Sequence, residues 1–259
     1  MFIVCLSGLL ALLVYSVICM IPAIIYKRID YADIAWGGGF IALVATTWWS
    51  IARVYDERLL IVCMVGVWGV RLSWHIWLRI RTSIHVDPRY DRLRNYWGNR
   101  YQAVGIAVHF LAQAVLTIII ALPILFYMSH HDENRSLFFV AAGLLIWSFG
   151  FIYECIADYQ LAVFLKKPSH RGQLLKTGLW KYSRHPNYFG EIVQWWSFWV
   201  MTLAIPLGWT TFFGPLLITY MIVAVSGVVP SEHQMASLSG FAEYKKKTSC
   251  LVPWPPLKI

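Results

Sequence analysis

Polar and ionisable side chains recur at helical spacing inside apolar stretches of the sequence. Glu154 and Asp158 lie four residues apart, as do Asn187 and Glu191, and Trp195 follows after four more. Residues at this spacing share one face of an α-helix. An ionisable side chain inside a membrane span costs about 2.5–3.5 kcal/mol on insertion scales, so it marks a functional site by default. We therefore interpret these residues as facing one binding site.

Three other apolar stretches carry the same kind of signal. Arg71, His75 and Arg79 lie on one helix face, Asp33 stands near the start of another stretch, and Ser231–His233 ends the last one. All lie at the same end of their stretches, so we expect a shared cavity in one leaflet. The alternative is that they are interfacial side chains that reach toward water.

Two basic segments, 79–100 and 166–187, connect the apolar stretches and contain tyrosine or tryptophan among the cations. Arginine forks suit phosphate oxygens, and the 2′-phosphate of a nucleotide would explain the cluster. Binding of anionic lipid headgroups is the alternative. No glycine-rich GxGxxG motif follows a predicted strand, so a nucleotide would have to bind among helices.

The composition indicates a membrane protein, because 59% of the 259 residues are hydrophobic and only 14% are charged. We expect an all-α polytopic protein that forms one transmembrane domain over residues 1–259, with a tilt or kink at Pro123. The first 26 residues are interpreted as a spanning helix and not as a cleaved signal peptide. The seven predicted spans are Phe2–Tyr26, Ile34–Ala52, Leu59–Leu78, Tyr101–Met128, Leu137–Ala157, Tyr188–Pro206 and Thr211–Val229.

Basic residues are distributed unevenly between the two sets of loops. Of the 22 lysines and arginines, 18 fall on one side of the predicted topology and three on the other. By the positive-inside rule this puts the N-terminus outside and the C-terminus in the cytoplasm. We expect an integral protein of a bacterial inner membrane or the endoplasmic reticulum, with its active site facing the cytoplasm. Topology explains the net charge of +9, so no nucleic-acid partner is implied.

The five cysteines show no spacing typical of a metal site. None forms a CxxC pair or lies at zinc-ligand spacing from a histidine, and we interpret them as packing residues. We therefore predict no metal ligand.

Three segments of the C-terminal half resemble the steroid 5α-reductase family. They are GLWKYSRHPNYFGEIVQWW (178–196), ADYQLAVFLKKP (157–168) and SEHQMASLSGFAEYKKKTSCLVPWPP (231–256). The RHPNY-type turn also occurs in sterol double-bond reductases and in isoprenylcysteine carboxyl methyltransferases, so alone it defines a superfamily and not a reaction.

The resemblance implies an NADPH site built by residues 137–259. It puts Asp158, Asn187, Glu191 and His233 at cofactor-contacting positions, and Glu154 where the reductases tend to have an amide. Further candidates lie beside the same motif or in the linking loop: Tyr182, Arg184, Tyr188, Trp195, Arg171 and Lys176.

The implied reaction is reduction of a carbon–carbon double bond conjugated to a carbonyl, by hydride transfer to the β-carbon. The lipophilic substrate would enter from the bilayer and meet residues 1–130. Candidates for polarising its carbonyl are Tyr31, Asp33, His75 and Tyr90.

Two other functions stay open. One is a methyltransferase that uses S-adenosylmethionine on an isoprenylcysteine or lipid carboxylate, which Arg71 or Arg184 would bind. Such enzymes favour an acidic pair before the final amphipathic helix, where this chain has only Glu232, so we favour the reductase. The other is a non-catalytic lipid-binding membrane protein. The sequence does not indicate the oligomeric state.

Overall fold

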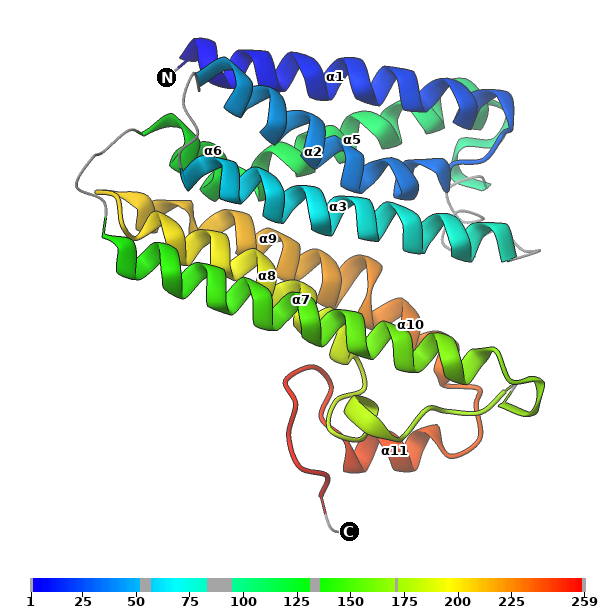
Figure 1. Ribbon diagram of the computed structural model, residues 1–259. Helices are drawn as coiled ribbons and strands as arrows, with labels where there is room; N and C mark the ends of the chain where they lie inside the picture. Colours follow the sequence, from blue (N-terminus) through cyan, green and yellow to red (C-terminus); the bar gives the residue numbers. More distant parts are fainter. Residues whose placement is uncertain (1, 52–56, 83–94, 131–135, 171, 258–259) are drawn as a thin grey trace. The chain divides into compact units, whose positions relative to one another are not determined.

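The computed structural model describes most of the chain as helix (Figure 1). The described residues are 2–51, 57–82, 95–130, 136–170 and 172–257. Across these ranges the regular structure is helical, apart from an isolated parallel bridge between Ser183 and Ser249. The all-α prediction is confirmed for this part of the chain. The chain divides into two compact units, Met1–Asn134 and Arg135–Ile259, which are described separately.

The first unit is built from long apolar helices. Its α-helices are α1 (Phe2–Ile25), α2 (Tyr31–Ile51), α3 (Glu57–Thr82), α5 (Ile106–Ile120) and α6 (Leu122–Ser129). A 3₁₀ turn (Gly98–Arg100) and a π-helical turn (Tyr101–Gly105) lead into α5. Small residues let the helix backbones approach closely, as is usual in membrane bundles. A Cβ atom on Gly69 of α3 would lie 2.7 Å from the carbonyl oxygen of Gly37 on α2, so this crossing requires glycine.

The predicted kink occurs at the expected place. Helices α5 and α6 are bent by 54° at Ala121, two residues before Pro123. Proline has no backbone N–H and its ring collides with the carbonyl of the preceding turn, so a continuous α-helix cannot run through this position.

The second unit is built around the antiparallel pair α7 (Leu137–Leu165) and α8 (Pro186–Thr202). Short 3₁₀ turns at Pro168–His170 and Gly178–Lys181 lie in the α7–α8 connection. After α8 come a 3₁₀ turn (Gly208–Phe212), α9 (Phe213–Tyr220), a π-helix (Met221–Ser226), α10 (Val228–Met235) and α11 (Phe241–Lys247).

Glycines also set the α7–α8 distance. A Cβ atom on Gly190 of α8 would lie 2.7 Å from both the carbonyl oxygen of Gly150 and the backbone nitrogen of Glu154. The two backbones therefore touch here, which brings polar side chains on either side of Gly190 within hydrogen-bonding reach of α7.

Among the described residues, five helical segments are long and apolar enough to cross a membrane, or six if the bent α5–α6 pair counts as one span. The five correspond to α1, α2, α3, α7 and the run Gly208–Met235. The prediction of seven spans is not confirmed, because α8 has only 17 residues. At 1.5 Å per residue that is about 26 Å, short of a hydrocarbon core of roughly 30 Å. The orientation of the termini stays a prediction.

Candidate functional site

Two side-chain hydrogen bonds join α7 to α8. The amide nitrogen of Asn187 donates to Asp158 Oδ1 at 3.1 Å, and that of Gln194 donates to Glu154 Oε2 at 2.6 Å. Asn187 and Gln194 lie seven residues apart, close to two helical turns, while the two acids lie one turn apart. We call these two bonds the acid–amide ladder. Its Glu154 rung is fully internal, because Glu154 is 3% exposed and Gln194 is 1% exposed.

Each amide of the ladder keeps an unused acceptor. Asn187 Oδ1 and Gln194 Oε1 are buried and accept no hydrogen bond from the residues that the structure describes. An unsatisfied buried acceptor costs about 1–3 kcal/mol. A ligand with hydroxyl or amino donors would relieve that cost, so this face of α8 suits a polar ligand.

Arg184 joins three segments just before α8. It is 6% exposed, and its Nε and Nη2 donate to Glu232 Oε1 of α10 at 2.7 and 2.5 Å. Its Nη1 donates to the carbonyl oxygens of Lys245 and Thr248 at the end of α11. The guanidinium therefore connects the start of α8 to α10 and to the end of α11.

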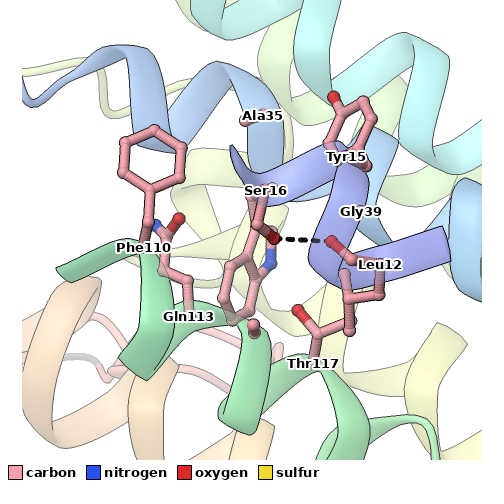
Figure 2. Close-up of a pocket in the computed structure, with 10 residues that line it drawn as sticks. Leu12, Tyr15, Ser16, Ala35, Gly39, Phe110, Gln113 and Thr117 are labelled. Carbon is pink, nitrogen blue, oxygen red and sulfur yellow. Dashed lines mark hydrogen bonds between the residues drawn. The ribbon is translucent and has the colours of Figure 1, made fainter. Parts of the chain in front are cut away.

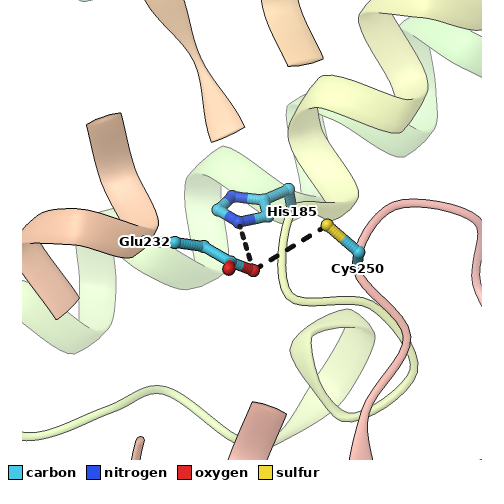
Figure 3. A group of neighbouring side chains, drawn as sticks. All are labelled: His185, Glu232 and Cys250. Carbon is cyan, nitrogen blue, oxygen red and sulfur yellow. Dashed lines mark hydrogen bonds and ion pairs between the residues drawn. The ribbon is translucent and has the colours of Figure 1, made fainter. Parts of the chain in front are cut away.

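Glu232 has several other partners, of which Figure 3 shows His185 and Cys250. Lys245 Nζ donates to Oε2 at 2.7 Å, and Cys250 Sγ lies 3.8 Å from Oε1. His185 Nε2 lies 3.7 Å from Oε1. We call Arg184, His185, Glu232, Lys245 and Cys250 the Glu232 cluster.

His185 is neutral at neutral pH. Burial lowers the pKa of its imidazole from 6.5 to about 4, and Arg184 adds to this shift while Glu232 opposes it. The ring stacks on Tyr188 with centroids 5.5 Å apart. The Tyr188 hydroxyl in turn lies 3.3 Å from Ser231 Oγ on α10. His185 and Tyr188 thus extend the contact between α8 and α10.

The donor atoms of His185, Glu232 and Cys250 lie within 4.8 Å of one another, a grouping that could hold a metal ion (Figure 3). The surrounding charges oppose this. Both carboxylate oxygens already pair with the cations Arg184 and Lys245. Burial also raises the pKa of the Cys250 thiol, which disfavours the thiolate that a metal requires. We interpret the grouping as an ion-pair cluster.

The segment before α8 is held by α11 and the chain that follows it. Tyr244 Oη donates to the carbonyl oxygen of Trp180 at 2.5 Å, and Ser183 Oγ donates to that of Leu251 at 2.7 Å. Trp180 Nε1 donates to the carbonyl oxygen of Ala157 on α7 at 3.1 Å. These bonds fix the turn that presents Arg184.

The structure brings together some predicted cofactor residues and leaves others apart. Asp158, Asn187 and Glu154 meet in the ladder, whereas His233 lies exposed on α10. Lys176 is also exposed, with Nζ 3.4 Å from the carbonyl oxygen of Gly240.

The remaining predicted positions differ in burial. Glu191 is half-buried on α8, Trp195 is 2% exposed, and Tyr182 is 40% exposed. Arg171 lies outside the described residues. The cofactor contacts of this set stay predictions.

The candidates for carbonyl polarisation belong to the first unit. Tyr31 and Asp33 are half-buried in the first turn of α2, where Tyr31 stacks on Tyr26 at 5.9 Å. His75 is exposed on α3. Tyr90 falls outside the described part of the chain. Their catalytic roles stay predictions.

The first unit also contains a small pocket between α1, α2 and α5 (Figure 2). Its cavity volume is only about 10 Å³, about enough for one water molecule, and hydroxyl groups and the Gln113 amide lie among the apolar side chains of its wall. The lining residues are Leu12, Tyr15, Ser16, Ala35, Trp36, Gly39, Phe110, Gln113, Ala114 and Thr117.

Sequence reasoning missed several residues of the second unit. Gln194 lies seven positions after Asn187, so the helical spacing that selected Asn187 could have found it. The resemblance points to His233 and not to its neighbour Glu232. No sequence signal connects Cys250 or Lys245 to Arg184, because only the tertiary fold brings them together.

The fold and site define an all-helical membrane protein with a ladder of acids and amides and a buried ion-pair cluster in its C-terminal unit. The chain belongs to the DUF1295 family, which is described as a protein of unknown function and whose model matches residues 20–248.

Two curated proteins are similar to shorter parts of the chain. The chain is 39% identical over 82 residues to the steroid 5-alpha-reductase DET2 of Gossypium hirsutum, over 29% of this chain and 31% of that protein. It is 36% identical over 50 residues to the probable O-methyltransferase ustE of Ustilaginoidea virens, over 19% of this chain and 18% of that protein. The chain thus matches less than a third of either relative. No solved structure matches it significantly.

Proposed function

We propose that this protein is an NADPH-dependent oxidoreductase that reduces a carbon–carbon double bond conjugated to a carbonyl in a lipophilic, 3-oxo-Δ4 steroid-like substrate. The observation that carries the proposal is the acid–amide ladder, whose unused acceptors Asn187 Oδ1 and Gln194 Oε1 suit a ligand rich in donors. The partial similarity to a steroid 5-alpha-reductase supports the same function.

The residues of the second unit fit the chemical groups of NADPH. Ribose hydroxyls and the carboxamide are donors from which the oxygen of the half-buried Asn187 would accept a hydrogen bond. The exposed cation Lys176 would pair with phosphate. The cofactor supplies the hydride that adds to the β-carbon of the substrate.

The chain must supply the rest of the reaction. Negative charge develops on the carbonyl oxygen, and preorganised donors in a dry site stabilise such charge by a few kcal/mol. Tyr31, Asp33, His75 and Tyr90 are the proposed source of such a donor and of the proton that reaches the α-carbon. The site would face the cytoplasm, and the substrate would enter from the bilayer.

Cofactor binding tests the proposal directly. Asn187→Ala and Glu191→Ala should weaken NADPH affinity about tenfold or more, because each removes a polar partner from a low-dielectric site. Gln234→Ala, which removes an exposed amide from α10, is the matched control and should bind NADPH normally. Affinity is measured by thermal stabilisation of the detergent-solubilised protein, and activity by NADPH consumption with a panel of enone lipids. Unchanged affinity in both α8 variants would refute the proposal that this face of α8 contacts NADPH.

The similarity to an O-methyltransferase favours a second candidate, an S-adenosylmethionine-dependent methyltransferase for an isoprenylcysteine or lipid carboxylate. Stabilisation by S-adenosylmethionine and not by NADPH would support this candidate. Stabilisation by neither ligand, together with lipid binding, would support a non-catalytic protein.

A further inference from the structure

The C-terminal segment Cys250–Leu257 is tied down through its backbone. The backbone nitrogen of Trp254 donates to the carbonyl oxygen of Tyr182 at 3.0 Å, and that of Leu257 donates to the carbonyl oxygen of Lys247 at 2.9 Å. Near its start, the carbonyl oxygen of Leu251 accepts a bond from Ser183 Oγ. The segment therefore has a defined path beside α11 and the turn before α8.

This fixed path holds large apolar side chains outside the protein. Val252 is 58% exposed, Trp254 is 67% exposed and Leu257 is 59% exposed, beside the 40% exposed Tyr182. At a surface that faces water, burying these side chains would be favourable, because it removes apolar area from the solvent. Exposed apolar groups held together by an ordered backbone mark a surface that meets an apolar partner.

The depth of this patch can be read from α7. Trp180, two residues before Tyr182, donates its ring N–H to the carbonyl oxygen of Ala157. Ala157 is 20 residues beyond Leu137, the first residue of α7. That distance is about 30 Å along a helix, the thickness of a hydrocarbon core. If α7 enters the hydrocarbon core at Leu137, the turn that carries Tyr182 therefore contacts α7 at the level of the opposite interface, where tryptophan and tyrosine concentrate in membrane proteins.

Two lysines lie on the segments to which the patch is hydrogen-bonded. Lys181 Nζ lies 5.8 Å from the centre of the Tyr182 ring, and Lys246 is exposed on α11. Lysines next to an apolar and aromatic surface complement the negative potential of anionic lipids.

We propose that Cys250–Leu257, with Tyr182, Lys181 and Lys246, forms a membrane-interface anchor. Trp254 and Leu257 insert between the headgroups of the bilayer, and the two lysines bind anionic phospholipids. This function is separate from the proposed oxidoreductase activity. It also keeps the end of α11 against Arg184, whose side chain donates hydrogen bonds to the carbonyl oxygens of Lys245 and Thr248.

A site-specific fluorophore tests the anchor in the full chain. The native cysteines are replaced by serine, and Trp254→Cys carries an environment-sensitive label in nanodiscs of phosphatidylcholine with or without phosphatidylglycerol. Quenching by lipids with a nitroxide on the headgroup is compared with quenching by aqueous iodide. Ser239→Cys, an exposed position between α10 and α11, is the matched control.

We expect the label at 254 to be quenched several-fold more strongly by nitroxide lipid than the label at 239, and more strongly with phosphatidylglycerol. Lys181→Gln and Lys246→Gln should each reduce the ratio of nitroxide to iodide quenching about fivefold in anionic discs. Equal quenching at both positions would overturn the proposal. Disulfide crosslinking between two unlabelled Trp254→Cys chains would instead assign the patch to a second copy of the protein and overturn it as well.

Discussion

The two units each contain a close arginine–carboxylate pair, and the pairs differ in what they connect. In the first unit Arg28 Nη2 lies 2.5 Å from Asp30 Oδ2, only two residues away, and the Arg28 side chain is 33% exposed while that of Asp30 is 5% exposed. In the second unit the Arg184–Glu232 pair has the same 2.5 Å separation but bridges 48 positions, with side chains 7% and 13% exposed. The first pair fixes a local turn between α1 and α2. The second pair holds distant segments together, as a preorganised site requires.

The helix interfaces show the same difference. Glycine contacts bring helices close in both units, at Gly37–Gly69 and at Gly150–Gly190. In the first unit α3 reaches α2 through a hydroxyl, since Ser73 Oγ donates to the Ile34 carbonyl oxygen. The second unit adds the acid–amide ladder. Close packing is therefore common to both units, and the pairing of acid and amide side chains between helices is what the second unit adds.

Removing the arginine of each pair should give the largest difference in stability between the two units. Arg184→Ala should lower the free energy of unfolding by about 3–5 kcal/mol, because Glu232 is left buried without its main partner. Arg28→Ala also leaves a buried carboxylate, because the Asp30 side chain is 5% exposed, but it removes a guanidinium that is 33% exposed and connects only neighbouring residues, so it should cost less, about 1–2 kcal/mol. Thermal unfolding in detergent measures both. Equal losses would show that sequence separation and burial do not decide the role of the pair.

Acid should destabilise the protein through His185. The unfolded imidazole takes up a proton near pH 6.5, whereas the folded one does so only near pH 4. The unfolded state therefore binds more protons between these values, and stability falls as the pH drops through this window, by up to about 3 kcal/mol. His185→Gln should flatten the dependence of the unfolding temperature on pH from 6.5 to 4. An unchanged profile in the variant would exclude His185 as its source.

Adding one methyl group to α8 tests the glycine contact. Gly190→Ala should cost about 1–3 kcal/mol or more, because the new Cβ meets backbone atoms at 2.7 Å that cannot move aside cheaply. Gly66→Ala on α3 is the control, since its Cβ would meet nothing within 4 Å, and it should be neutral or raise stability. Both are compared by unfolding temperature. An equal loss in both variants would show that the effect does not come from the close contact at Gly190.

Removing single serine hydroxyl groups should have the smallest effect on stability, and it can distinguish a structural role from a role in NADPH binding. Ser231→Ala and Ser73→Ala each remove one hydroxyl hydrogen bond and should each cost about 0.5–1.5 kcal/mol. Only Ser231→Ala removes a contact of the Tyr188 hydroxyl, so we expect it alone to change the affinity for NADPH. Parallel titrations of the two variants check this, and equal affinities would remove Tyr188 from the proposed site.

Helical periodicity predicted the fold class and part of the site. The apolar runs indicated the helices, Pro123 indicated the break after α5, and spacing placed Glu154, Asp158 and Asn187 on facing surfaces. Such patterns describe one helix at a time. The partner of Glu154 depends on how α8 docks on α7, so Gln194 was missed.

Helical periodicity in the sequence could not predict the Glu232 cluster. A π-helix and Gly227 change the helical phase ahead of α10, so counting residues could not show whether Glu232 or His233 turns toward Arg184. Cys250 arrives through an irregular segment that has no periodicity at all. Long-range contacts made by loops require the three-dimensional structure.

The length of α7 links the second unit to the physical state of the lipid. Its 29 residues extend about 43 Å, some 13 Å more than a typical hydrocarbon core. The part of α7 beyond Ala157 would then extend past the hydrocarbon core, and a thicker or thinner bilayer would change how much of it is covered by lipid. Gln160 and Ala157 near its far end accept hydrogen bonds from Leu179 and Trp180. The turn before Arg184 is therefore attached to the part of α7 whose surroundings would depend on bilayer thickness.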